Sequence, residues 1–157
     1  MVTDVGGRGY SQPQRPGEAV SYLELAALPS APFWARNQTK IALQAWRLPP
    51  ETVETAVLLA SELVTNAIAA TGPVRERLTY PELIGVERVS LTLRHLHSRV
   101  IIEVFDSSPN PPILDCADTD AESGRGLMLV QALSKEWNHF APPSGGKVVF
   151  CVIAAEF

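Results

Sequence analysis

This 157-residue chain has few cysteines, no excess of basic charge and no apolar segment of the kind that a signal peptide needs. Each of these features argues against a class of protein. Cys116 and Cys151 are the only cysteines and lack metal-ligand spacing, so a disulfide scaffold is not expected and a reducing interior is. The formal net charge of −4 argues against a broad contact with the phosphate backbone of nucleic acid.

The N-terminus has no apolar core of the kind that a signal peptide needs, and we expect no apolar run long enough to span a bilayer. A cytoplasmic protein without direct membrane or nucleic-acid contact is therefore expected. Residues 1–18 are rich in Gly, Pro, Gln and Arg, which predicts a disordered tail. Residues 19–157 are predicted to form one domain, because the chain's 46% apolar content suits a globular core.

The hydrophobic pattern predicts an α+β fold, a two-layer sandwich whose helices cover one face of a mainly antiparallel sheet. Alternation predicts strands, and helical spacing predicts helices, in the order β-α-α-β-β-α-β. The strands are expected at residues 20–28, 89–94, 100–105 and 147–154, and the helices at 30–46, 51–71 and 124–137. Segment 74–87 is interpreted as a loop. Trp34, Trp46 and Trp137 are interpreted as packing residues.

The helix expected at 51–71 combines a carboxylate and an amide on one face. Glu62 and Asn66 are four residues apart, and side chains at that spacing are neighbours on a helix. Because much of the remaining helix surface is apolar, we expect the pair to face a cleft. A carboxylate can take a proton or orient a water, and an amide oxygen is a hard ligand suited to Mg²⁺. For this pair alone, a solvated polar stripe is the simpler interpretation.

Two further stretches suit a nucleotide. Asp106 ends an apolar strand, where it either accepts from the exocyclic amino group of a purine or caps the turn through its own backbone. Gly124 and Gly126 flank Arg125 at a helix start, which lets N–H groups and a guanidinium approach an anion. Taken alone, the turn cap is favoured for Asp106, and the glycine pair is as typical of a turn as of a phosphate site.

Together, four segments resemble the sequence boxes of one family, in its order and at about its spacings. They are Glu62-Leu63-Val64-Thr65-Asn66-Ala67, Val104-Phe105-Asp106-Ser107-Ser108-Pro109-Asn110-Pro111-Pro112, Glu122-Ser123-Gly124-Arg125-Gly126-Leu127 and Gly145-Gly146-Lys147-Val148-Val149-Phe150. Over about residues 20–156 the chain resembles the GHKL superfamily of histidine-kinase-like (HATPase) ATP-binding proteins. Within it, the chain is similar to anti-sigma-factor serine/threonine kinases and to the stand-alone ATP-binding regulatory proteins of actinomycetes.

The resemblance implies a Bergerat-type ATP-binding fold with ATP and Mg²⁺ as ligands. It implies that Asn66 holds the Mg²⁺, that Glu62 is the catalytic base and that Asp106 accepts from the adenine amino group. It also implies a phosphate side formed by Gly124, Arg125, Gly126 and Leu127, with residues 107–123 as an ATP lid.

The sequence departs from the family pattern in three places. After Asp106 it reads Ser-Ser-Pro-Asn-Pro where the family has glycines, so the backbone there is stiffer. After Asn66 it has Ala67-Ile68-Ala69-Ala70 where the family often has a histidine or another polar residue. Lys147 replaces a threonine that often lies near the adenine. We include Lys147 among the ATP-binding residues and expect it either to reach a phosphate or to lie in solvent.

The leading interpretation is an ATP- and Mg²⁺-dependent serine/threonine protein kinase, a transferase that phosphorylates an anti-sigma antagonist and controls a transcription regulator. The partner implied is a sigma factor or an anti-sigma antagonist protein, and a homodimer is a further hypothesis, from the family and the exposed first strand. The alternative is a non-catalytic protein-binding module that uses nucleotide, or only the fold. A third and weaker hypothesis is an ATPase domain detached from a sensor kinase, because the sequence shows no phosphoacceptor-histidine helix of the kind that a sensor kinase has.

Overall fold

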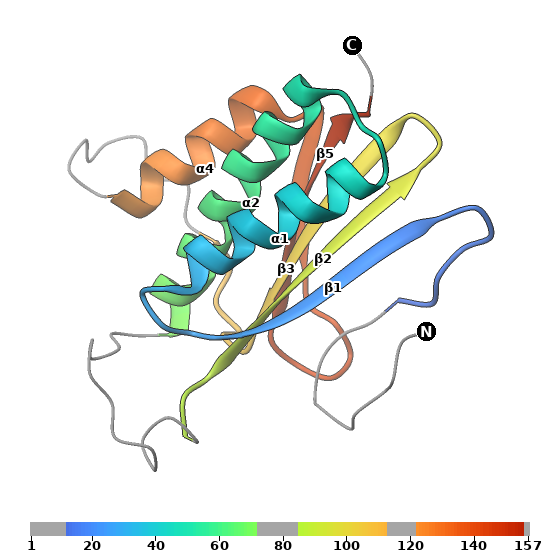
Figure 1. Ribbon diagram of the computed structural model, residues 1–157. Helices are drawn as coiled ribbons and strands as arrows, with labels where there is room; N and C mark the ends of the chain where they lie inside the picture. Colours follow the sequence, from blue (N-terminus) through green and yellow to red (C-terminus); the bar gives the residue numbers. More distant parts are fainter. Residues whose placement is uncertain (1–11, 72–84, 113–121, 156–157) are drawn as a thin grey trace.

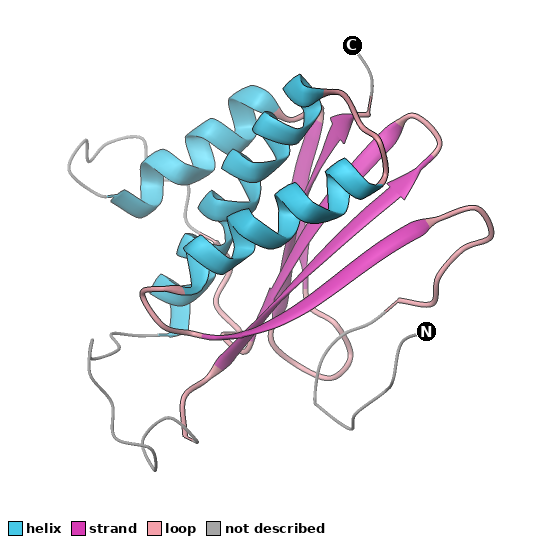
Figure 2. Cartoon of the chain, viewed as in Figure 1, coloured by secondary structure: helices cyan, strands magenta, loops and turns pink. Residues whose placement is uncertain are grey.

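A five-stranded sheet and three helices form the described part of the chain as two layers (Figures 1 and 2). The structure is a computed structural model that describes residues 12–71, 85–112 and 122–155, except the side chains of residues 122–125. Its elements are β1 (Ala19–Ala26), α1 (Ala31–Ala45), α2 (Pro50–Thr71), β2 (Arg88–Leu96), β3 (Arg99–Asp106), α4 (Glu122–Leu133), β4 (Glu136–Phe140) and β5 (Lys147–Ala154). The predicted α+β sandwich is confirmed.

The strands lie in the order β1-β2-β3-β5-β4, and every neighbouring pair is antiparallel. Successive side chains of a strand point to opposite faces of the sheet. Leu91, Val104 and Val149 are adjacent in register and buried in the core that the sheet shares with the helices. Asp106 and Lys147 pair across β3 and β5, two residues along from Val104 and Val149. Their side chains therefore point to the same, helix-covered face of the sheet.

Helix α2 is the central helix, packed between α1 and α4 and against β3 (Figure 1). Leu59 lies on the same side of α2 as Glu62 and Asn66, and it is completely buried. The interpretation of that side as a solvated polar stripe is therefore wrong. Among the described residues, α2 is also the one helix that is long and apolar enough to cross a membrane, contrary to the expectation that no apolar run has that length. Its position between two helices and against the sheet is that of a core helix.

The chain around residue 135 differs from the sequence expectation. The helix predicted to continue to about Trp137 ends at Leu133, and Glu136–Phe140 forms the edge strand β4. Lys135 already donates its backbone N–H to the carbonyl of Val152, at 2.8 Å, so β5 satisfies backbone groups that a longer helix would have used. Leu133 and Trp137 fit a helical period in sequence, but Trp137 pairs with Cys151 across β4 and β5.

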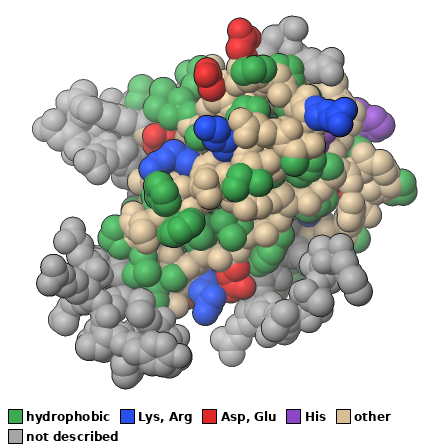
Figure 3. Space-filling model, viewed as in Figure 1, with side chains coloured by type: hydrophobic (Ala, Val, Ile, Leu, Met, Phe, Trp, Pro, Cys, Tyr) green, Lys and Arg blue, Asp and Glu red, His purple; other side chains and the backbone are tan. Residues whose placement is uncertain are grey.

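The helical face displays large apolar side chains to solvent (Figure 3). Phe33, Trp34 and Ile41 of α1 are 55%, 53% and 54% exposed. The prediction that Trp34 packs in the core is therefore wrong, whereas Trp46 and Trp137 pack against the core as expected.

Part of the predicted tail is tied to the other face of the sheet. Glu18 is buried, and its carboxylate accepts from Arg94 Nη1 at 3.3 Å and from the backbone N–H of Arg15 at 2.7 Å. Arg94 also donates to Glu103 at 3.2 Å and to the carbonyl of Gln12 at 3.3 Å. Burial raises the pKa of Glu103, although Arg94 opposes the change. Gln12 and Glu18 of this segment are therefore hydrogen-bonded to Arg94 of β2.

Several predictions fall wholly or partly outside the described residues. These are the first eleven residues of the tail, most of the loop at 74–87, the centre of the lid at 107–123, and Cys116. The domain boundary at residue 19 stays a prediction.

A two-glycine turn brings the start of β5 against the end of β3. Gly145 and Gly146 have φ angles of +94° and +74°, a region that L side chains rarely adopt. A Cβ atom on Gly146 would overlap the backbone oxygen of Asp106 and would lie 2.7 Å from the ring of Phe105. A Cβ atom on Gly145 would meet no atom within 4 Å. Only Gly146 therefore combines backbone strain with a close approach.

Gly146→Ala is expected to destabilise the protein more than Gly145→Ala. Both variants incur the left-handed backbone cost of roughly 1–2 kcal/mol. Gly146→Ala adds overlap with β3, which costs about a further 1–3 kcal/mol. Chemical denaturation of the two variants and the wild type measures the difference. Equal losses in both variants would contradict the close approach of β5 to Asp106.

Candidate functional site

Asp106 and Lys147 form a buried ion pair at the carboxyl end of β3. They are direct partners in the β3–β5 register, and Lys147 Nζ donates to Asp106 Oδ1 at 3.0 Å. Lys147 is 3% exposed and Asp106 is completely buried. The expectation that Lys147 lies in solvent is wrong, because its ammonium is buried at the aspartate. A contact between Lys147 and a phosphate stays a prediction.

The two carboxylate oxygens of Asp106 differ. Oδ1 also accepts from the backbone N–H of Ser108 at 2.9 Å, which is the turn cap considered from sequence. Oδ2 is buried and has no hydrogen-bond partner among the described residues. Burial raises the pKa of Asp106, while the bonds from Lys147 and Ser108 oppose that rise. A buried acceptor without a donor is costly, so Oδ2 suits a ligand that supplies one.

A cavity of about 300 Å³ adjoins this pair. Asn66 of α2 and Lys147 of β5 both line it, so the structure brings together residues from two of the four sequence boxes. The rest of its lining comes from the end of α2 and from the segment after Asp106: Ala69, Ala70, Ser108, Asn110, Pro111 and Pro112. Asn66 is 9% exposed, which fits a polar side chain directed at a cleft.

The third box meets Glu62 on the neighbouring helix. A Cβ atom on Gly126 would lie 2.5 Å from Glu62 Oε2, so α4 approaches the carboxylate closely only because residue 126 has no side chain. Helix α4 begins at Glu122, so Gly124, Arg125 and Gly126 lie inside the helix and do not precede it. The side chain of Arg125 lies outside the described residues. Leu127 is 1% exposed and belongs to the hydrophobic core.

Two residues that fix the geometry belong to the sequence boxes but were given no role there. Ser108 supplies the N–H that orients Asp106, and Gly146 allows Lys147 to begin β5 beside it. The Gly-Gly pair before Lys147 was the available signal for a tight approach. In the described ranges, no group of three or more His, Cys, Asp and Glu side chains could hold a metal ion. A metal at this site would therefore need a ligand such as the Asn66 amide together with atoms of a bound anion.

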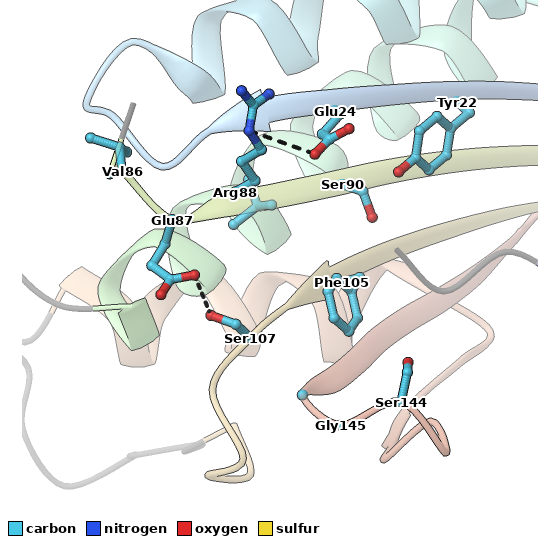
Figure 4. Close-up of a pocket in the computed structure, with 13 residues that line it drawn as sticks. Tyr22, Glu24, Val86, Glu87, Arg88, Ser90, Phe105, Ser107, Ser144 and Gly145 are labelled. Carbon is cyan, nitrogen blue, oxygen red and sulfur yellow. Dashed lines mark hydrogen bonds and ion pairs between the residues drawn. The ribbon is translucent and has the colours of Figure 1, made fainter. Parts of the chain in front are cut away.

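A larger cavity, of about 630 Å³, lies on the sheet face turned away from the helices. Figure 4 shows Tyr22, Ser90 and Phe105 in its wall, and none of the predicted site residues line it. Its charged groups are partnered: Arg88 lies 3.8 Å from Glu24, and Ser107 donates to Glu87 at 3.0 Å. Size favours this cavity, but chemistry favours the smaller one, because Asn66 and Lys147 line it. Asp106 is not among its lining residues, but it bonds to two of them, Lys147 and Ser108, and its Oδ2 has no donor among the described residues.

Comparison with known proteins gives one informative match. The family model of the histidine kinase-like ATPase domain matches residues 26–152. A comparison with curated proteins finds no match.

Lys147→Met is expected to destabilise the nucleotide-free protein by about 3–5 kcal/mol, because it leaves a buried carboxylate without its cation. Arg88→Met, which removes an exposed ion pair, is the control and should cost no more than about 1 kcal/mol. Loss of Lys147 removes a group that lowers the pKa of Asp106, so that pKa rises further. A carboxyl whose folded pKa is raised stabilises the fold less as pH increases.

The deficit of Lys147→Met relative to wild type is therefore expected to be smallest near the ordinary aspartate pKa of 3.8 and to grow towards neutral pH. Denaturation at a series of pH values measures it. A deficit that is the same at every pH would contradict the pairing.

Proposed function

Because the chain belongs to the histidine kinase-like ATPase domain family, we propose that it binds ATP together with Mg²⁺ in the cavity beside Asp106. An ATPase domain implies ATP as the ligand. The observation on which the proposal mainly rests is the buried Oδ2 of Asp106, which has no donor among the described residues. The exocyclic amino group of adenine can donate a hydrogen bond to Oδ2. Because an ionised carboxylate only accepts hydrogen bonds, Asp106 favours a base with an amino group at that position over a base with a carbonyl there.

The remaining residues fit the rest of the ligand. Asn66 lines the same cavity as Lys147, and its amide oxygen is suited to a Mg²⁺ that also contacts phosphate oxygens. Glu62 lies one helical turn before Asn66, next to Gly126 in the N-terminal half of α4. The N-terminus of a helix favours anions, which supports a phosphate position at that end. When bound, ATP with Mg²⁺ supplies a transferable phosphoryl group.

We further propose phosphoryl transfer to a protein hydroxyl, as in anti-sigma-factor serine/threonine kinases. Glu62 is the proposed catalytic base, because it is a partly exposed carboxylate at the junction of α2 and α4. Its role would be to accept the proton of the attacking hydroxyl while the surrounding groups hold the phosphates in position. The proposed partner is an anti-sigma antagonist or a sigma factor, through which the protein would control transcription in the cytoplasm.

Surface features support a protein partner. The exposed Phe33, Trp34 and Ile41 of α1 are side chains of the kind that protein interfaces bury. Strand β1 forms one edge of the sheet, as predicted, and an open edge can pair with a second chain. A homodimer through β1 therefore stays a proposal, and the molecular mass in solution tests it.

One observation favours a second candidate, a protein-binding module without catalysis. Asn110 and Pro111, from the Ser-Ser-Pro-Asn-Pro segment where the family has glycines, line the cavity, so the wall is stiffer and bulkier there. In that case nucleotide, or the fold alone, would control a protein contact. Saturable binding of ATP without phosphate transfer to any candidate partner would favour this alternative.

Calorimetric titration of ATP tests the site. The wild type is expected to bind ATP more tightly with Mg²⁺ than with a chelator. Asp106→Asn should weaken binding about tenfold or more, because an amide that accepts from Lys147 turns its NH₂ group towards the adenine amino group. Asn66→Ala should remove most of the advantage that Mg²⁺ gives. A folded wild type that binds no ATP would exclude this function.

Glu62→Ala is expected to retain ATP binding and to reduce phosphate transfer by about 100-fold or more, as loss of a general base does. Gly126→Ala is the matched variant: its new methyl group displaces the Glu62 carboxylate, so transfer should fall while the carboxylate is still present. Radiolabelled phosphate transfer to a candidate partner and calorimetry on the same samples separate the two effects. Unchanged transfer in Glu62→Ala would show that Glu62 is not the base.

A further inference from the structure

Lys147 has donors to spare at the edge of the cavity. An ammonium group carries three N–H bonds. Among the described residues, its one hydrogen-bond partner is Asp106 Oδ1, at 3.0 Å. The side chain is 3% exposed, yet it lines the cavity together with Asn66. A buried ammonium in this position can therefore donate to a ligand without leaving Asp106.

Asp106 and Lys147 together present an acceptor beside a donor. Their positions are fixed by the β3–β5 register, in which they are direct partners. Oδ1 of Asp106 is occupied by Lys147 and by Ser108, so Oδ2 is the oxygen left for a ligand. A carboxylate only accepts and an ammonium only donates. The pair thus complements a ligand edge on which a donor and an acceptor are adjacent.

We propose that Lys147 donates to a ring nitrogen next to the exocyclic amino group of the bound base. Asp106 and Lys147 would then recognise that edge as one unit. In adenine the amino group lies between N1 and N7, and both of these ring nitrogens accept hydrogen bonds, whereas N3 is remote from it. This inference rests on the proposed function and makes Lys147 a specificity-determining residue.

The test compares four nucleotides by calorimetry on the full chain: ATP, 1-deaza-ATP, 7-deaza-ATP and 3-deaza-ATP. Either the 1-deaza or the 7-deaza analogue is expected to bind the wild type at least about tenfold more weakly than ATP, since a hydrogen bond from a charged donor is lost. The 3-deaza analogue is the control and is expected to bind like ATP. In Lys147→Met the penalty of the affected analogue is expected to disappear.

A second readout needs no variant. The chain has three lysines, Lys40, Lys135 and Lys147, and the first two are exposed, which allows the Nζ signal of Lys147 to be assigned by NMR. That signal is expected to shift when ATP is added, and to shift less with the weaker analogue.

Equal affinity of the wild type for ATP and for both analogues would overturn the inference and leave ATP binding in place. A penalty that persists in folded Lys147→Met would assign the contact to another group and would also overturn it. No binding of any of the four nucleotides to folded wild type would overturn the proposed function and this inference together.

Discussion

The ion pair between Asp106 and Lys147 is the constraint on which the candidate site depends. Removing two charges from water is expensive, and their attraction compensates only when the geometry is good. That geometry requires strands β3 and β5 to be paired in one register, because a slip of one residue would move either side chain to the other face. Gly146 allows the approach, since a side chain there would meet Asp106 and Phe105. The sheet register and the site are therefore determined together.

Helix α2 connects this end of the site to the helical layer. Asn66 lines the cavity beside Lys147, and Glu62 contacts the glycine of α4 one turn earlier, about 6 Å along the helix axis. Polar residues on a helix that is otherwise buried need partners of this kind. Leu59 continues the same side into the core. The core thereby places the Asn66 amide at the cavity and the Glu62 carboxylate against α4.

The sequence pattern was most informative where local rules and burial agree. Alternation in β1 and β2, the apolar runs of β3 and β5 and the long apolar helix α2 were enough for the layers and for the antiparallel sheet. It failed at β4, where Trp137 fits a helical period but backbone groups pair with the free edge of β5. It also failed at Trp34, because periodicity cannot tell which side of a helix the fold covers.

For this protein, the sequence by itself determined the fold class, the placement of Glu62 and Asn66 on one helix face, and the position of Asp106 at a strand end. These follow from local periodicity and from the spacing of the motifs. Only the tertiary structure decided that Lys147 is buried against Asp106, that Gly126 contacts Glu62, and that Glu18 is tied to Arg94. The partners in these contacts are 41, 64 and 76 residues apart, and no local pattern encodes which distant residue will supply a buried charge or a close backbone.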